Sequence, residues 1–218
     1  MTSFSYGSKW PQYRVQWNQM EAINQDAADL YRALAEEAID HKSRYMGVEL
    51  ETDVPWMLIA ALHMREASFD WDTYLGNGQP LDQVTTWVPE GRGPFDTWED
   101  GAIDALQYDG LDEVIDWRLE KMLFNAEAYN GAGYHNKGLP SPYIWSLTNI
   151  QEPGKYTSDG NFDPNHYDTQ PGCAGLLYAI NKLNPPSQYQ REEATPTWFD
   201  MSRIHIVIRE IRTRLQGE

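Results

Sequence analysis

One segment of the chain, PWMLIAALHM at residues 55–64, would be apolar on nearly every face of a helix. A surface helix keeps one polar side, so a helix that is apolar all round has to be enclosed by other elements. Pro55 stands where the first turn of a helix tolerates proline, and Thr52 or Asp53 can cap that turn. The segment therefore predicts a buried central helix that ends around residues 66–68.

Other segments predict the helices that would surround it. Apolar residues recur every three or four positions over residues 19–46, which predicts an amphipathic helix stopped by Gly47. Residues 111–129 show the same spacing, and Thr97 with Asp100 is spaced as a capping box that opens a short helix. A further apolar helix is predicted over GCAGLLYAINKL, close to the middle of the second half.

Two stretches interrupt this helical pattern. Residues 70–95 are rich in glycine and proline and predict an irregular lobe, with a short strand at 83–89. Residues 131–171 are loop-rich, and their aromatic content favours a functional role over disorder. The predicted fold class is therefore mainly α, or α+β with a small irregular or β lobe, built around the buried central helix.

The chain divides into three predicted parts. Residues 1–184 would form the main domain, and the proline-rich and polar residues 185–197 would form a linker. Residues 198–218 would form a C-terminal helical element. The alternation of isoleucine there leaves a strand as the alternative.

Composition excludes several classes of protein. The hydrophobic content of 41% is enough to build a core, which argues against a disordered chain. A formal net charge of −16 argues against nucleic acid as a partner, because phosphate binding needs Lys and Arg. No apolar run has the length of a membrane span, and no signal peptide is visible, so we expect no membrane insertion. Cys173 is the only cysteine, which fits a reducing cytoplasm.

Glu66 stands at the predicted end of the buried helix. Burial and the helix dipole would both favour its protonated form there. A carboxylic acid that stays neutral near physiological pH suits general acid catalysis. The structural alternative is an ion pair with Arg65, or a side chain that simply reaches solvent. His63, one turn earlier, is either a core histidine or a hydrogen-bond partner of Glu66.

Two motifs end predicted helices in this order along the chain: EASF at 66–69 and AYNG at 128–131. Together they resemble the lysozyme-like superfamily of peptidoglycan-cleaving glycosidases, especially soluble lytic transglycosylases and goose-type lysozymes, whose motifs read Glu-Ser-x-Phe and Ala-Tyr-Asn-x-Gly. Ala67 replaces the family's serine, Ser68 is displaced by one position, and the second glycine is Gly133. The surrounding sequence is also similar to phage and bacterial lysozyme-family muramidases.

The resemblance covers roughly residues 50–180 and implies a glycosidase that cuts the β-1,4 bond between N-acetylmuramic acid and N-acetylglucosamine. It implies that Glu66 is the catalytic acid and that no metal or organic cofactor takes part. Tyr129 would help orient the acid, and Asn130 would line the neighbouring sugar subsite. The product would be a reducing sugar from a lysozyme or a 1,6-anhydro sugar from a lytic transglycosylase.

A second carboxylate is expected only for a lysozyme. The paired acids of hydrolytic glycosidases lie about 5–5.5 Å or about 6.5–9.5 Å apart. A transglycosylase needs none, because the sugar's own C6 hydroxyl attacks. The candidates share the lobe after Glu66, where turn capping is the alternative role; they are Asp70, Asp72, Asp82 and Asp96. The residues expected to bind glycan follow the two motifs; they are Ser68, Trp71, Tyr74, Asn77, Tyr129, Asn130, Tyr134, Tyr143 and Trp145.

The expected partners are glycan strands of peptidoglycan. We expect a phage product, either held in the host cytoplasm before release or packaged with other virion proteins. Two alternatives remain: a virion or envelope structural protein that binds glycan without cleaving it, and a chitinase-type glycosidase. The alternating Asp and Asn residues at 159–165 resemble the start of a calcium loop, but Pro164 and Gln170 break that pattern, so turn chemistry is expected there.

Overall fold

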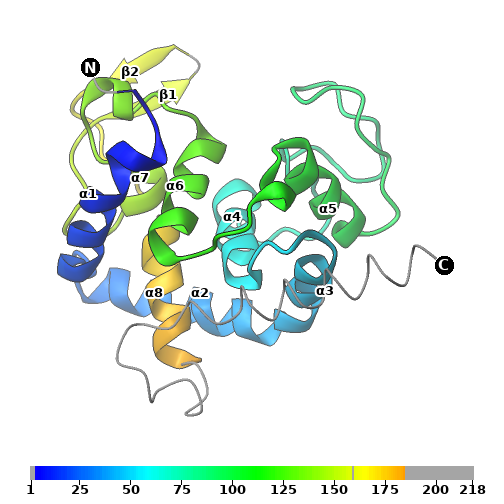
Figure 1. Cartoon of the computed structure of the whole chain (residues 1–218), viewed down its shortest axis with the longest axis horizontal. Helices are drawn as coiled ribbons and strands as arrows, with labels where there is room; N and C mark the ends of the chain where they lie inside the picture. The colour runs from blue at the N-terminus through cyan, green and yellow to red at the C-terminus, as the bar shows by residue number, and fades with distance from the viewer. Residues whose placement is uncertain (1–2, 159, 185–218) are drawn as a thin grey trace.

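The computed structural model describes residues 3–158 and 160–184 (Figure 1). The predicted linker, 185–197, and the predicted C-terminal element, 198–218, lie outside the described residues. Over the described residues the fold is mostly helical with a small two-stranded sheet, as the mainly α prediction requires. In this part of the chain no helix has both the length and the apolar character needed to cross a membrane.

The elements follow one another in this order: α1 (Tyr6–Gln19), α2 (Gln25–Asp40), α3 (Lys42–Thr52), α4 (Trp56–Ala67), α5 (Trp98–Tyr108), η1 (Leu111–Glu113), α6 (Leu119–Asn130), η2 (His135–Lys137), α7 (Pro142–Trp145), β1 (Lys155–Ser158), β2 (Asn161–Asp163) and α8 (Cys173–Leu183). The two strands form an antiparallel hairpin with an irregularity between Tyr156 and Ser158.

Helix α4 is the buried central helix that its sequence predicts. Residues 58–65 are all buried, and α2, α3, α6 and α8 pack against the helix. Figure 1 shows α4 in the middle of the fold, with α1, α6, α7 and the β1–β2 hairpin on one side. On the other side lie α3, α5 and the irregular segment 70–95. Helix α4 therefore stands between two halves of the molecule.

The single helix predicted over 19–46 is wrong, because the chain forms two helices there. Helix α2 begins after Asn24, whose side chain accepts a hydrogen bond from the Ala27 amide at 2.8 Å. The chain breaks at His41, which lets α2 and α3 both reach α4. Gly47 does not stop a helix, since it lies inside α3.

Two other expected helix boundaries are also wrong. Asp53 does not cap α4 but ends α3 in the left-handed conformation, with φ of 58°, and Pro55 is the N-cap of α4. The helix predicted over 111–129 is interrupted after η1. The Asp116 carboxylate accepts a hydrogen bond from the Arg118 amide at 3.1 Å just before α6, and Ile115 is 73% exposed. Thr97 caps α5 as expected, since its hydroxyl accepts a hydrogen bond from the Asp100 amide at 3.1 Å, but the Asp100 carboxylate accepts from the Thr97 hydroxyl and not from its amide, so the capping box is only half formed. The helix over 173–183 is confirmed.

The strand predicted at 83–89 does not form, although the lobe is irregular as expected. The Gln79 side chain accepts hydrogen bonds from the backbone amides of Thr86 and Trp87, both at 2.8 Å. The Asn77 side chain donates to the Trp87 carbonyl at 3.1 Å. These side chains use the backbone groups that a neighbouring strand would need.

Candidate active site

The end of α4 combines a core anchor with an outward-facing acid. Ser68 and Phe69 both adopt the left-handed conformation, with φ of 51° and 63°, so the chain reverses immediately after the helix. The Ser68 amide donates to the Met64 carbonyl at 3.0 Å. Phe69 is buried and packs against His63, with 5.7 Å between ring centroids. The reversal therefore returns the chain to the core and leaves Glu66 facing outward.

Glu66 accepts one short hydrogen bond from a buried tyrosine. The hydroxyl of Tyr143, on α7, donates to Glu66 Oε1 at 2.6 Å. The Glu66 side chain is exposed, yet burial of its carboxyl is the main cause that raises its pKa. Protein atoms therefore surround part of the carboxyl while solvent still reaches the side chain. The Tyr143 hydrogen bond and the Arg65 charge lower the Glu66 pKa in part.

A second carboxylate interacts with this acid. The charge of Asp109, which follows α5, adds to the rise of the Glu66 pKa, and burial raises the pKa of Asp109 itself. The pKa of Tyr129 on α6 is raised mainly by burial, and then by the charges of Glu66 and Asp109. The ends of three helices thus bring ionisable side chains near Glu66. Sequence patterns gave no reason to select Asp109.

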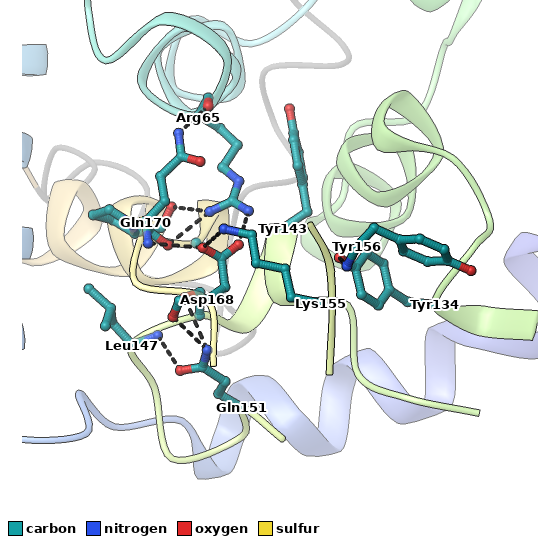
Figure 2. Close-up of polar contacts among 12 residues, drawn as sticks. Arg65, Tyr134, Tyr143, Leu147, Gln151, Lys155, Tyr156, Asp168 and Gln170 are labelled. Carbon is teal, nitrogen blue, oxygen red and sulfur yellow. Dashed lines mark hydrogen bonds and ion pairs between the residues drawn. The ribbon is translucent and has the colours of Figure 1, made fainter. Parts of the chain in front are cut away.

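Arg65 does not pair with Glu66, which removes the structural alternative of an ion pair between neighbours. Its guanidinium pairs instead with Asp168 and donates to the Gln170 carbonyl at 2.8 Å (Figure 2). The Lys155 ammonium binds the other oxygen of Asp168 at 2.8 Å. Within residues 3–158 and 160–184, Glu66 takes part in no ion pair.

Several aromatic residues expected to line a glycan groove are buried, and that expectation is wrong for them. Trp145 is 1% exposed and belongs to the core. Tyr74 is fully buried and donates to Asp104 at 2.8 Å. Tyr134 is 7% exposed, and its hydroxyl accepts a hydrogen bond from the Tyr156 amide at 3.2 Å. Tyr143 is also buried, and its hydroxyl donates a hydrogen bond to Glu66 instead of facing solvent.

Two aromatic candidates, Trp71 and Tyr129, are half-buried. The Arg44 guanidinium lies 3.9 Å from the ring centroid of Trp71, and His63 and Trp98 pack against the same ring. Trp71 lines a pocket of about 620 Å³ together with three of the four aspartates considered as second carboxylates; they are Asp72, Asp82 and Asp96. Glu66 does not line that pocket.

The other predicted site residues hold turns and helix ends. Asp70 accepts a hydrogen bond from the Asp72 amide at 2.9 Å, which is turn capping. Asn77 does the same for the Gln79 amide at 3.1 Å. Ser68 and Asn130 are exposed at the ends of α4 and α6.

Tyr129 does not orient Glu66 through its hydroxyl, because that hydroxyl donates to the Leu75 carbonyl at 3.1 Å. Tyr143 provides the hydrogen bond instead. The sequence selected Tyr143 for its aromatic ring. No local pattern indicates that a residue 77 positions away would direct its hydroxyl at the end of α4.

His63 and Cys173 both lie in the core, where their contacts are structural. His63 Nε2 lies 2.9 Å from the Asp70 carbonyl and Nδ1 lies 3.0 Å from the Tyr45 hydroxyl, so the histidine supports the fold and not Glu66. Cys173 is fully buried, and burial raises the pKa of its thiol to about 12. The Asp163 carboxylate accepts a hydrogen bond from the Asn165 amide at 2.9 Å, a turn of the kind expected there.

Among the described residues no three His, Cys, Asp or Glu side chains are grouped so that they could hold a metal ion. Comparison of the chain with known protein families, with curated proteins and with solved structures gave no match. The chemistry open to the site is that of Glu66: a carboxyl that solvent can reach, whose raised pKa favours the protonated form, and which a buried hydroxyl holds in place.

Proposed function

We propose that the protein is a peptidoglycan-cleaving glycosidase, either a lysozyme or a lytic transglycosylase, in which Glu66 is the general acid. The observation that carries the proposal is the outward-facing Glu66 carboxyl with its raised pKa and its hydrogen bond from buried Tyr143. A buried helix that ends in the acid, beside an irregular lobe, is compatible with a lysozyme-like fold, which is part of the same proposal.

In this proposal the protonated Glu66 donates its proton to the glycosidic oxygen as the bond to N-acetylmuramic acid breaks. Tyr143 keeps its own proton, since burial and then the Glu66 charge raise its pKa well above the usual range. Its hydroxyl therefore goes on donating to Glu66 and stabilises the carboxylate that forms.

The second half of the reaction distinguishes the two enzymes. In a lysozyme, Asp109 would be the second carboxylate and would act on water or on the sugar ring. In a lytic transglycosylase, the C6 hydroxyl of the sugar would attack while Glu66 takes its proton, and Asp109 would only tune Glu66. Glycan strands are the proposed partner, and a phage origin, in the host cytoplasm before release or within the virion, belongs to the same proposal.

The decisive variant is Glu66→Gln, measured by the clearing of purified cell walls. It keeps the shape of the side chain but removes the transferable proton, and general acid catalysis is worth about 10²–10⁴-fold. We expect the lysis rate to fall by that factor. Thermal stability should hold or rise, because an ionisable group surrounded by protein becomes neutral. Glu152→Gln, a change at an exposed glutamate, is the matched control and should lyse at the wild-type rate.

Lysis by Glu66→Gln at the wild-type rate would end the proposal. A folded wild-type protein that binds wall glycan without cutting it would be the structural glycan-binding protein, and one that cuts only chitin oligomers would be the chitinase-type glycosidase. Mass spectrometry of the wild-type products gives reducing ends for a lysozyme and anhydro ends for a transglycosylase. Asp109→Asn should be severe only in the first case.

A further inference from the structure

Tyr143 contacts two neighbouring residues of α4 with different parts of its side chain. Its hydroxyl donates to Glu66 at 2.6 Å. Its ring faces the Arg65 guanidinium, whose central carbon lies 5.1 Å from the ring centroid. Arg65 is buried, so this cation is held between the ring and its other partners. The position of Arg65 therefore bears on the hydroxyl that holds the acid.

Asp168 is the partner that holds Arg65. Its carboxylate is fully buried and receives Arg65, the Lys155 ammonium at 2.8 Å and the Gln170 amide at 3.0 Å (Figure 2). Burial alone would raise the Asp168 pKa, but the Arg65 charge and the bonds from Lys155 and Arg65 hold it below its usual range. Asp168 is therefore a charged partner of Arg65 at neutral pH.

The backbone of Asp168 is held as firmly as its carboxylate. Its carbonyl accepts hydrogen bonds from Ser146 Oγ at 2.7 Å and from Gln151 Nε2 at 2.8 Å. Ser146 directly follows α7, the helix that carries Tyr143. One residue thus ties the end of α4, the end of α7 and strand β1 together.

We propose that Asp168 is a positioning residue for Glu66: it holds Arg65 against the face of Tyr143 and so fixes the hydroxyl that donates to Glu66. Its consequence for catalysis rests on the proposed function of Glu66, whereas its consequence for the Glu66 carboxyl can be measured without any substrate. Lys155, on the β1–β2 hairpin, completes the arrangement by binding the second oxygen of the Asp168 carboxylate.

Three side chains influence the Glu66 pKa, and they come from different elements; they are Tyr143 on α7, Arg65 on α4 and Asp109 after α5. Burial raises the pKa of Tyr129 on α6 and of Cys173 on α8, and the Glu66 charge in turn raises both further. Arg65 lowers the Glu66 pKa, and Asp168 offsets that positive charge. Asp168→Asn has two effects on the Glu66 pKa with opposite signs: the lost anion lowers it, whereas release of Arg65 from the Tyr143 ring weakens the hydrogen bond from Tyr143, which raises it. Only the second effect needs the Tyr143 hydroxyl. The shift caused by Asp168→Asn should therefore be more positive in the presence of Tyr143 than in a Tyr143→Phe background.

The experiment is a carbon-13 NMR titration of glutamate carboxyl groups in the full chain, with the Glu66 signal assigned by its loss in Glu66→Gln. We expect the Glu66 pKa shift caused by Asp168→Asn to be more positive with Tyr143 present than in the Tyr143→Phe background. Glu127→Gln is the matched control, since Glu127 is also a fully buried carboxylate that binds a lysine, Lys9, at 3.1 Å. That variant should leave the Glu66 titration unchanged.

An equal Glu66 pKa shift in the two backgrounds would overturn the inference, because Asp168 would then act on Glu66 by its charge alone. If Asp168→Asn does not fold, the same comparison is made with Lys155→Met, because the Lys155 side chain is 29% exposed and its removal disturbs less of the core. An equal shift in the two backgrounds there would be equally contrary. Where the wild type lyses walls, Asp168→Asn should lose up to about 10²-fold in rate. If the wild type does not lyse walls, the titration still tests the positioning of Glu66 while the proposed function alone fails.

Discussion

The neutral state of His63 should make the fold sensitive to mild acid. The Asp70 carbonyl can only accept a hydrogen bond, so Nε2 carries the proton and Nδ1 accepts from the Tyr45 hydroxyl. Burial is the main cause that lowers the pKa of His63 from 6.5 to about 4. One pKa unit corresponds to about 1.4 kcal/mol. At low pH the protonation of His63 on unfolding therefore lowers the free energy of unfolding by about 3 kcal/mol.

The sign follows from the direction of that shift. Between pH 6.5 and about 4 the unfolded chain holds the His63 proton and the folded chain does not. The contribution of His63 to stability is therefore complete above pH 6.5 and is lost as the pH falls toward 4. In the middle of this range the free energy of unfolding should fall by about 1.4 kcal/mol for each pH unit on account of this residue.

Urea unfolding at a series of pH values across this range measures the slope. His63→Gln should be less stable at neutral pH. The slope of its free energy of unfolding against pH should be smaller than that of the wild type by about 1.4 kcal/mol per pH unit. His166→Gln, at an exposed histidine, is the matched control and should keep the wild-type slope. Equal slopes for the wild type and His63→Gln would refute the reasoning, whatever the absolute stabilities.

Three further outcomes are expected. Tyr143→Phe removes a hydrogen bond that lowers the Glu66 pKa, so the alkaline limb of the lysis profile should move to higher pH; an unmoved limb would contradict the assigned donor. Trp145→Ala should cost about 3–5 kcal/mol in urea unfolding, whereas Trp87→Ala, at a side chain 63% exposed, should change stability by less than about 0.5 kcal/mol. Cys173 should resist thiol reagents in the native protein and react once urea unfolds it, and rapid native labelling would show that the thiol is not buried.

The sequence predicted the elements whose signals are local. An all-round apolar helix has one physical solution, which is enclosure, and α4 is enclosed. The Thr97 cap satisfies the Asp100 amide within its own turn, so it could be found without knowing the rest of the fold. The raised pKa of Glu66 was expected for the same reason, since its cause is the burial of the helix that it ends.

The errors arise where contacts distant in sequence override a local pattern. The apolar spacing of 111–129 continues through a segment in which Ile115 is exposed, because Asp116 turns the chain before α6. Residue type alone also could not distinguish an aromatic side chain in the core from one that lines a groove. Tyr74 and Trp145 have the flat apolar rings that stack on sugars, and those rings fill the core just as well.

The position of Tyr143 explains geometrically why the residue that follows Glu66, Ala67, needs no hydrogen-bond donor. Neighbouring residues of a helix point about 100° apart, so Arg65 turns toward buried Asp168 while Glu66 turns outward. Tyr143 spans both directions, with its ring on Arg65 and its hydroxyl on Glu66. The hydrogen bond to Glu66 thus comes from α7 rather than from the next residue of the chain, and a side chain without a donor can follow Glu66. The same geometry makes the acid depend on the segment that holds Arg65, which is why residues 155–170, far from either motif, bear on the chemistry of Glu66.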